Sequence, residues 1–127
     1  MENAINKIMI VEDDESVGEL LHTIFAGVIG KYQVVYVKDG EEALKLARIV
    51  VPDIILLDIN LPGLNGYDVC RQVKTDPNMS QTKIIMVTGM AQNSDWAKSK
   101  EAGADDYFTK PFRATALVER VETLLNK

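Results

Sequence analysis

The stretch DIILLDINLPG, residues 53–63, combines a short aliphatic run with a carboxylate at its end. The aliphatic residues 54–57 stop at Asp58, and the chain then turns through a segment that contains Asn60, a proline and a glycine. A short apolar run followed by turn residues is typical of a buried strand. Because a carboxylate is costly to bury without a partner, the position of Asp58 has to be explained by its neighbours.

Outward from this stretch, apolar runs and helical patterns alternate along the chain. Short runs rich in β-branched residues predict strands, and apolar residues at helical spacing predict helices. The predicted strands are 7–11, 32–38, 53–57, 83–88 and 105–109, and the predicted helices are 15–30, 39–50, 66–76, 93–104 and 113–127. Strands joined by crossover helices run parallel, so we expect an α/β fold with one five-stranded parallel sheet and helices on both faces.

Length, composition and charge favour one domain and exclude several classes of protein. The 127 residues are 46% hydrophobic, which is enough for one core, so we expect a single domain over 1–127. The formal net charge is −5 without a basic block, which argues against direct binding of nucleic acid. With one cysteine, Cys70, no visible signal peptide and no apolar run of membrane-spanning length, we expect no membrane contact and a cytoplasmic location.

Polar residues follow the predicted strands where ligand sites of open parallel sheets lie, beyond the carboxyl ends. In chain order they are Glu12, Asp13, Asp58, Asn60, Thr88 and Lys110. Three carboxylates brought together repel one another unless a cation lies between them. An all-oxygen set without histidine or cysteine suits Mg²⁺, and the backbone turn at Asn60 can add a carbonyl oxygen.

A cation, the amine of Lys110 and the hydroxyl of Thr88 together favour an anion with several oxygens at Asp58. A phosphoryl group is the obvious candidate, because its transfer is catalysed mostly by positioning and charge neutralisation. A carboxylate can itself act as the nucleophile and form an aspartyl phosphate. Each residue taken alone is compatible with an ordinary surface role, so the prediction depends on their joint placement at strand ends.

The chain resembles the receiver domains of two-component response regulators, and in particular the stand-alone chemotaxis regulators. The resemblance extends from Lys7 to the last helix and is carried by four motifs in order: IMIVEDDE, DIILLDINLPGLNGYDV, IIMVTG and GADDYFTKPF. It implies a doubly wound, flavodoxin-like sheet with strand order 2-1-3-4-5.

The resemblance implies that Asp58 is the phosphoacceptor of a phosphorelay. It would receive the phosphoryl group from a sensor histidine kinase or a His-containing phosphotransfer protein in a Mg²⁺-dependent reaction. Asp13 and Asp58 would bind the metal, Glu12 would act largely through water, and Asn60 would contribute its backbone carbonyl. The domain would therefore not be an enzyme acting on an external substrate, although it would catalyse its own phosphorylation and dephosphorylation.

A switch is also implied by the resemblance. Thr88 would bond a phosphoryl oxygen, Lys110 would pair with the phosphate, and the Lys110–Pro111 peptide bond would be cis. Tyr107 matches the aromatic residue that turns inward when the threonine moves. A population shift in the fourth helix, fifth strand and fifth helix would then control a downstream effector protein or domain. The chain would be a monomer, or a dimer formed through this face on phosphorylation.

Some positions depart from the commonest family pattern or invite a second interpretation. Gly89 stands where a small side chain such as alanine is frequent, which suggests a looser loop. Met90 is apolar where many members carry a polar residue, and we hypothesise that it shields the phosphoryl group from water. Asp105 and Asp106 are interpreted as strand-entry residues that form salt bridges with a partner helix or a second copy.

Four alternative functions compete with that of a phosphoacceptor. A hydrolase of the haloacid-dehalogenase type would need a second aspartate two residues after Asp58, where this chain has Asn60. A flavin-binding module would need a Ser/Thr/Gly-rich phosphate loop after the first strand, where the acidic run 12–15 would repel phosphate. An interaction module that is never phosphorylated remains open, as does the receiver portion of a longer regulator or hybrid kinase.

Overall fold

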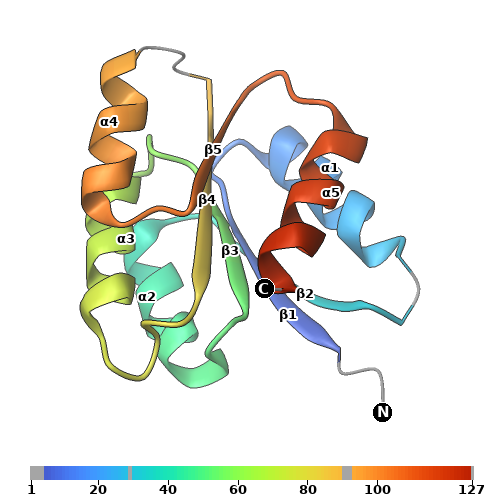
Figure 1. Cartoon of the computed structure of the whole chain (residues 1–127), viewed down its shortest axis with the longest axis horizontal. Helices are drawn as coiled ribbons and strands as arrows, with labels where there is room; N and C mark the ends of the chain where they lie inside the picture. Colours follow the sequence, from blue (N-terminus) through green and yellow to red (C-terminus); the bar gives the residue numbers. More distant parts are fainter. Residues whose placement is uncertain (1–4, 29, 90–92, 127) are drawn as a thin grey trace.

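The structure is a computed structural model that describes residues 5–28, 30–89 and 93–126. Strands and helices alternate along the whole described chain, as the sequence predicts (Figure 1). Their bounds are β1 Asn6–Val11, α1 Glu15–Ala26, β2 Tyr32–Val37, α2 Gly40–Val50, β3 Ile54–Leu57, α3 Gly66–Thr75, β4 Lys83–Thr88, α4 Asn93–Ala102, β5 Asp106–Thr109 and α5 Ala114–Leu125. None of the described helices is long and apolar enough to cross a membrane.

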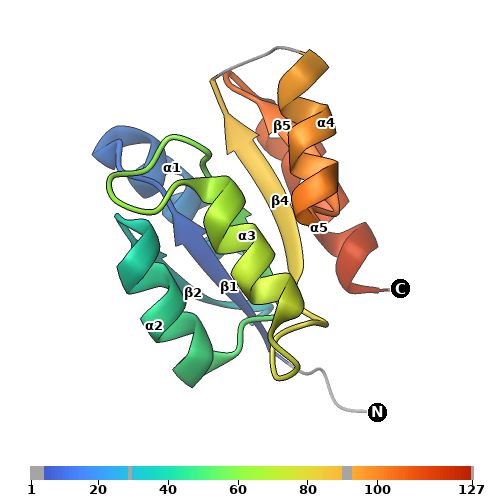
Figure 2. The same cartoon turned by 90° about the vertical axis from the view of Figure 1, so that its left-hand side faces the viewer.

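The five strands form one parallel sheet in the order β2-β1-β3-β4-β5, which confirms the predicted topology. Helices α1 and α5 lie on one face, and α2, α3 and α4 lie on the other (Figures 1 and 2). The order along the sheet reverses between β1 and β3, because the chain continues from β1 to β2 on one side and from β3 to β4 on the other. Ligand sites of open parallel sheets form beyond the carboxyl ends of the strands near such a point.

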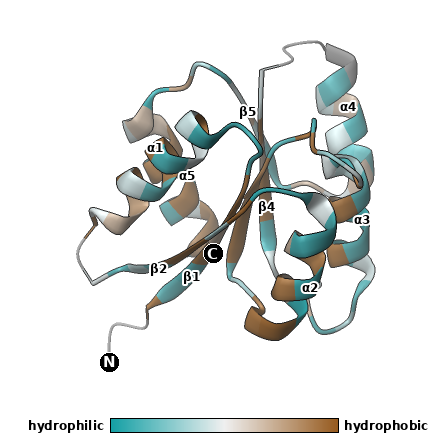
Figure 3. Ribbon diagram, turned by 180° about the vertical axis from the view of Figure 1, so that it is seen from behind, coloured by the Kyte–Doolittle hydropathy of each residue, from teal (hydrophilic) through white to brown (hydrophobic). Residues whose placement is uncertain are grey.

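The apolar core is divided by the sheet into two layers. In β3, Ile54 and Leu56 pack against α1 and α5, while Ile55 and Leu57 pack on the opposite side. These four side chains are at most 1% exposed, and the central strands are correspondingly hydrophobic in Figure 3. Both faces of β3 are therefore covered, which explains why its sequence is a continuous apolar run instead of an alternating pattern.

Most predicted boundaries differ from the observed ones by a few residues at helix ends. Helix α1 ends at Ala26, and the amide of Val28 then bonds the carbonyl of Phe25, three residues back, so the helical bonding pattern is broken. Helix α4 ends at Ala102, before Gly103 adopts a φ of 105°, where only glycine is unstrained. The predicted N-cap of α2 is confirmed: Oδ1 of Asp39 accepts a 2.7 Å hydrogen bond from the amide of Glu42.

Helix α2 ends in a strained conformation that the sequence does not announce. Val51 has φ 49° and ψ 74°, a left-handed conformation that is an outlier for a β-branched residue. Its side chain is 41% exposed, so little packing is lost on truncation. We expect Val51→Gly to raise the free energy of unfolding by about 1 kcal/mol, measured by urea denaturation. The neighbouring Val50→Gly, inside the helix, should lower the free energy of unfolding by about 1 kcal/mol. Equal effects of the two substitutions would contradict backbone strain at Val51.

Candidate functional site

Three carboxylates meet at the carboxyl edge of the sheet. Glu12 and Asp13 follow β1, Asp58 follows β3, and one oxygen of each lies within 4.8 Å of the others. Glu12 and Asp58 are buried, 1% and 6% exposed, whereas Asp13 is exposed. The predicted convergence of these residues is confirmed, and its cause is the parallel pairing of β1 with β3.

Backbone hydrogen bonds fix the two buried carboxylates in place. The amide of Asp58 donates to the carbonyl of Val11 at 3.0 Å, and the amide of Glu12 donates to the carbonyl of Val37 at 3.1 Å. Both bonds extend the sheet pairing past the strand ends, so the two residues inherit the rigidity of the sheet. The amide of Asn60 donates to Oδ1 of Asp58 at 3.3 Å.

Lys110 lies at the same edge of the sheet, as the sequence predicts, and there it pairs with both buried carboxylates. Its Nζ lies 2.7 Å from Oε1 of Glu12 and 3.2 Å from Oδ2 of Asp58. The Lys110–Pro111 peptide bond is cis, as the resemblance implies. The amide of Lys110 donates to the carbonyl of Thr88 at 2.8 Å, so the lysine is tied to the end of β4.

The charges at this site do not balance without a further cation. The pKa of Glu12 is raised to about 7: burial raises it most, the hydrogen bond from Lys110 lowers it in part, and the charge of Asp58 raises it further. Burial lowers the pKa of Lys110, but the hydrogen bond to Glu12 and the charge of Asp58 outweigh this and raise it overall. The site thus holds three carboxylates and one lysine, so its negative charge is only partly neutralised. The hard oxygen ligands of the three carboxylates suit Mg²⁺.

Thr88 and Tyr107 lie on the two strands beside the carboxylates. Thr88 ends β4, is fully buried and pairs in register with Thr109 of β5. Tyr107, on β5, is half-buried, and its ring centroid lies 5.7 Å from that of Trp96 on α4. The structure thus places the threonine at the carboxyl edge and the tyrosine between this edge and α4. Met90, the hypothesised shield, lies outside the described residues.

The acidic run 12–15 is divided between three roles. Glu12 and Asp13 face the site, whereas Asp14 caps α1, its Oδ1 accepting the amide of Ser16 at 3.0 Å. Glu15 pairs with Lys38 of the edge strand region. The N-cap function of Asp14 was missed, although an aspartate directly before a helical pattern is a recognisable signal for it.

Asp105 and Asp106 form salt bridges with helices of the same chain, which is the first of the two predicted alternatives, a partner helix or a second copy. Oδ2 of Asp105 lies 2.8 Å from Nζ of Lys74 on α3, and Oδ2 of Asp106 lies 2.6 Å from Nε of Arg120 on α5. These pairs hold β5 to the helices on either side of the sheet. Cys70 is buried, and burial raises the pKa of its thiol to about 12, in agreement with a structural role.

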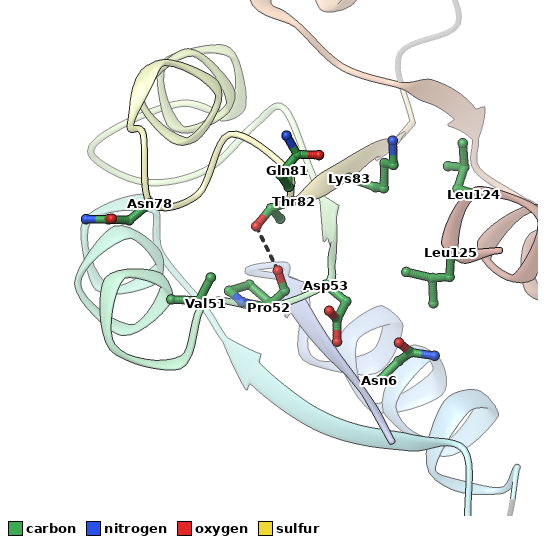
Figure 4. A pocket seen from close by; sticks show the side chains of 10 residues that line it. All are labelled: Asn6, Val51, Pro52, Asp53, Asn78, Gln81, Thr82, Lys83, Leu124 and Leu125. Carbon is green, nitrogen blue, oxygen red and sulfur yellow. Dashed lines mark hydrogen bonds between the residues drawn. The ribbon is translucent and has the colours of Figure 1, made fainter. Parts of the chain in front are cut away.

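A cavity of about 280 Å³ lies at the opposite edge of the sheet (Figure 4). Asn6, Asp53 and Lys83 line it near the amino ends of the strands, and Leu124 lines it from α5. None of the carboxylates described above is among its lining residues. The cavity is therefore distinct from the charged site, and the chemistry of the site follows from the carboxylates and Lys110.

Metal binding at this edge is expected to depend on Asp13 and not on the acidic run as a whole. Asp13→Asn removes one of three converging ligands, so the affinity for Mg²⁺ should fall roughly tenfold or more. Glu15→Gln removes the same charge two residues away, where the carboxylate pairs with Lys38, and should leave the affinity nearly unchanged. Calorimetric titration with Mg²⁺ measures both, and equal losses would indicate a diffuse charge effect instead of coordination.

Comparison with known proteins supports the arrangement over the whole chain. The family model for the response regulator receiver domain matches residues 8–122. The DNA-binding response regulator MtrA of Mycolicibacterium smegmatis is 38% identical over 127 residues, which are 100% of this chain and 54% of that protein. The chain thus spans about half the length of this curated relative.

Two solved structures share the fold closely. A putative response regulator from Chloroflexus aurantiacus has a TM-score of 0.92 and 35% identity, covering 98% of this chain and 100% of the other. The receiver domain of sensor histidine kinase PA1611 from Pseudomonas aeruginosa, with a magnesium ion coordinated in its active site cleft, has a TM-score of 0.88 and 29% identity, with coverage of 98% and 100%.

Proposed function

This chain belongs to the receiver-domain family of two-component response regulators, and on that basis we propose that Asp58 accepts a phosphoryl group in a phosphorelay. The donor would be a sensor histidine kinase or a His-containing phosphotransfer protein. The observation that carries the proposal is a buried aspartate at a strand end, 3.2 Å from a lysine and within 4.8 Å of two further carboxylates.

The proposed reaction forms and breaks one bond at phosphorus. A carboxylate oxygen of Asp58 attacks the phosphorus, and the bond from phosphorus to the donor nitrogen breaks, leaving its electron pair on the donor. The signal ends by hydrolysis: a water oxygen attacks the phosphorus, the bond from phosphorus to Asp58 breaks, and inorganic phosphate leaves. Asp58 is regenerated, so the cycle switches the domain without converting an external substrate.

The residues around Asp58 would manage the negative charge of the phosphoryl group. Mg²⁺ would be held by Asp13, Asp58 and the backbone carbonyl of Asn60, with Glu12 acting largely through water, and it would neutralise part of the charge on the phosphoryl oxygens. Lys110, already 3.2 Å from Asp58, would pair with another phosphoryl oxygen, and the hydroxyl of Thr88 would donate to a third. The amide side chain of Asn60 cannot act as a general acid or base, as the second aspartate of a haloacid-dehalogenase-type hydrolase does. This argues against the hydrolase alternative.

The output would be a shift of the α4/β5/α5 face. Lys110 and Thr88 are joined by a backbone hydrogen bond, so both would follow the phosphoryl group together. Tyr107 and Trp96 extend this contact from β5 to α4. The face would act on a downstream effector protein or domain, in a monomer or a phosphorylation-linked dimer. The domain itself, with a formal net charge of −5, would not contact nucleic acid directly.

The proposal is tested by loading the wild-type protein from a small phosphoryl donor. With Mg²⁺ and acetyl phosphate, we expect a mass gain of one phosphoryl group per chain, located by tandem mass spectrometry in the peptide that contains Asp58. Chelation of Mg²⁺ should slow the gain by roughly a hundredfold or more, since charge neutralisation is lost. An unmodified protein under conditions where Mg²⁺ binds would contradict the proposal and favour an interaction module that is never phosphorylated.

A further inference from the structure

Helix α4 buries an unusual face. Its buried side chains, among those described, are Asp95, Ser99 and Ala102, which lie at positions i, i+4 and i+7 on one side of the helix. The buried side chains of α5 are two leucines and a valine. Small and polar side chains remove little apolar surface from water, so α4 gains less from packing than α5 does.

Asp95 joins α4 to α3 through a single long hydrogen bond. The hydroxyl of Tyr67 donates to Oδ1 of Asp95 at 3.3 Å, and the aspartate is only 7% exposed. Its second oxygen, Oδ2, is buried and has no hydrogen-bond partner within the described part of the chain. A buried carboxylate oxygen without a partner loses its hydration with no compensation. The docked position of α4 therefore includes an unfavourable contact.

Tyr107 of β5 lies close to the same carboxylate. The pKa values of Tyr67 and Tyr107 are both raised, first by burial and then by the charge of Asp95. The ring of Tyr107 also contacts Trp96, the residue that follows Asp95. A change at Tyr107 thus reaches α4 in the turn that carries the aspartate.

We propose that Asp95 is a positioning residue that sets how readily α4 moves away from α3. The hydrogen bond from Tyr67 holds α4 against α3. The buried Oδ2, which has no partner among the described residues, reduces the free energy gained by this docking. The inference rests on the proposed function and deepens it, because it identifies the group that makes α4 the movable part of the α4/β5/α5 face. The docked and displaced positions of α4 then differ little in free energy, so a phosphoryl group at Asp58 can shift the population from one to the other.

Two conservative substitutions should act in opposite directions on α4. Asp95→Asn keeps an acceptor for Tyr67 and removes the buried charge, so the amides of residues 95–102 should exchange hydrogen roughly three- to tenfold more slowly. Tyr67→Phe removes the donor and leaves both carboxylate oxygens unpaired, so the same amides should exchange faster by a similar factor. Exchange is measured in the unmodified protein, with the amides of α5 as the reference for global stability.

Matched controls separate this role from general damage. Asp68→Asn changes a half-buried aspartate of α3 that pairs with Arg71, and Tyr32→Phe changes a half-buried tyrosine of β2. Both should leave exchange in α4 at the wild-type rate. Unchanged exchange in Asp95→Asn and Tyr67→Phe, changes of the same sign in both, or changes shared in full by α5 would overturn the inference.

Loading with Mg²⁺ and beryllofluoride, a phosphoryl analogue, links the residue to the switch. Exchange in α4 of the wild type should rise on loading, and Asp95→Asn should show a smaller rise. A wild type that does not respond to loading would count against the proposed function alone. The opposite shifts in the unmodified variants would still decide the role of Asp95.

Discussion

Asp58→Asn is expected to abolish phosphoryl incorporation from acetyl phosphate while leaving the domain folded. The amide side chain has nearly the shape of the carboxylate but is a poor nucleophile, so the bond to phosphorus does not form. In the wild type, Nζ of Lys110 also lies 2.7 Å from Oε1 of Glu12. This pair is kept in the variant, so the charge of Lys110 is not left without a partner. The free energy of unfolding should therefore change by no more than about 1 kcal/mol.

The same strand supplies a matched control for this substitution. Asp53 lies at the opposite end of β3, where its Oδ2 accepts the amide of Lys7 at 2.7 Å. Asp53→Asn should be modified to the wild-type extent, as measured by intact mass after incubation with Mg²⁺ and acetyl phosphate. Full incorporation in Asp58→Asn would move the phosphoacceptor elsewhere, and loss in both variants would indicate damage to the strand and not to the nucleophile.

Gly66→Ala is expected to destabilise the domain by about 3 kcal/mol or more. A Cβ at Gly66 would lie 2.3 Å from the carbonyl oxygen of Asp58 and 2.8 Å from Cα of Ile59. Both are backbone atoms, which cannot rotate away as a flexible side chain can. The amide of Gly66 also donates to the carbonyl of Ile59 at 2.8 Å, so the helix start would lose this bond as it moved. Urea denaturation followed by circular dichroism measures the loss.

Gly89→Ala is the control for this packing argument. A Cβ at Gly89 would have no heavy atom of the described residues within 4 Å, and the residue is exposed at the end of β4. Its substitution should change the free energy of unfolding by no more than about 0.5 kcal/mol. A Gly66→Ala protein as stable as Gly89→Ala would show that α3 can shift at little cost, and would remove the close approach as a constraint on the site.

The carboxylate site could be predicted because its residues follow strands. A parallel sheet brings the carboxyl ends of its strands to one edge, so the order of strands and polar residues in the sequence is enough to bring Glu12, Asp58 and Lys110 together. Their roles came from the resemblance to receiver domains, and the cis bond before Pro111 came from the same source.

The remaining contacts could not be predicted in this way. Asp105 and Asp106 resemble each other as sequence neighbours, yet one side chain reaches α3 and the other reaches α5. The reason is that consecutive residues entering a strand point to opposite faces of the sheet. Val51 likewise adopts a left-handed conformation that its own propensity opposes, because the chain must leave α2 and enter β3 within a few residues.

The alternation of strands and helices, the parallel sheet and the residues at its carboxyl edge can all be predicted from the sequence. These follow from periodicity and from order along the chain, which are local properties. Packing in three dimensions brings Gly66 against the backbone of Asp58, lets Lys110 bridge two buried carboxylates, and buries Asp95 with one oxygen that has no partner among the described residues. These contacts join different strands, helices and loops, so they form only once the helices have packed on the sheet.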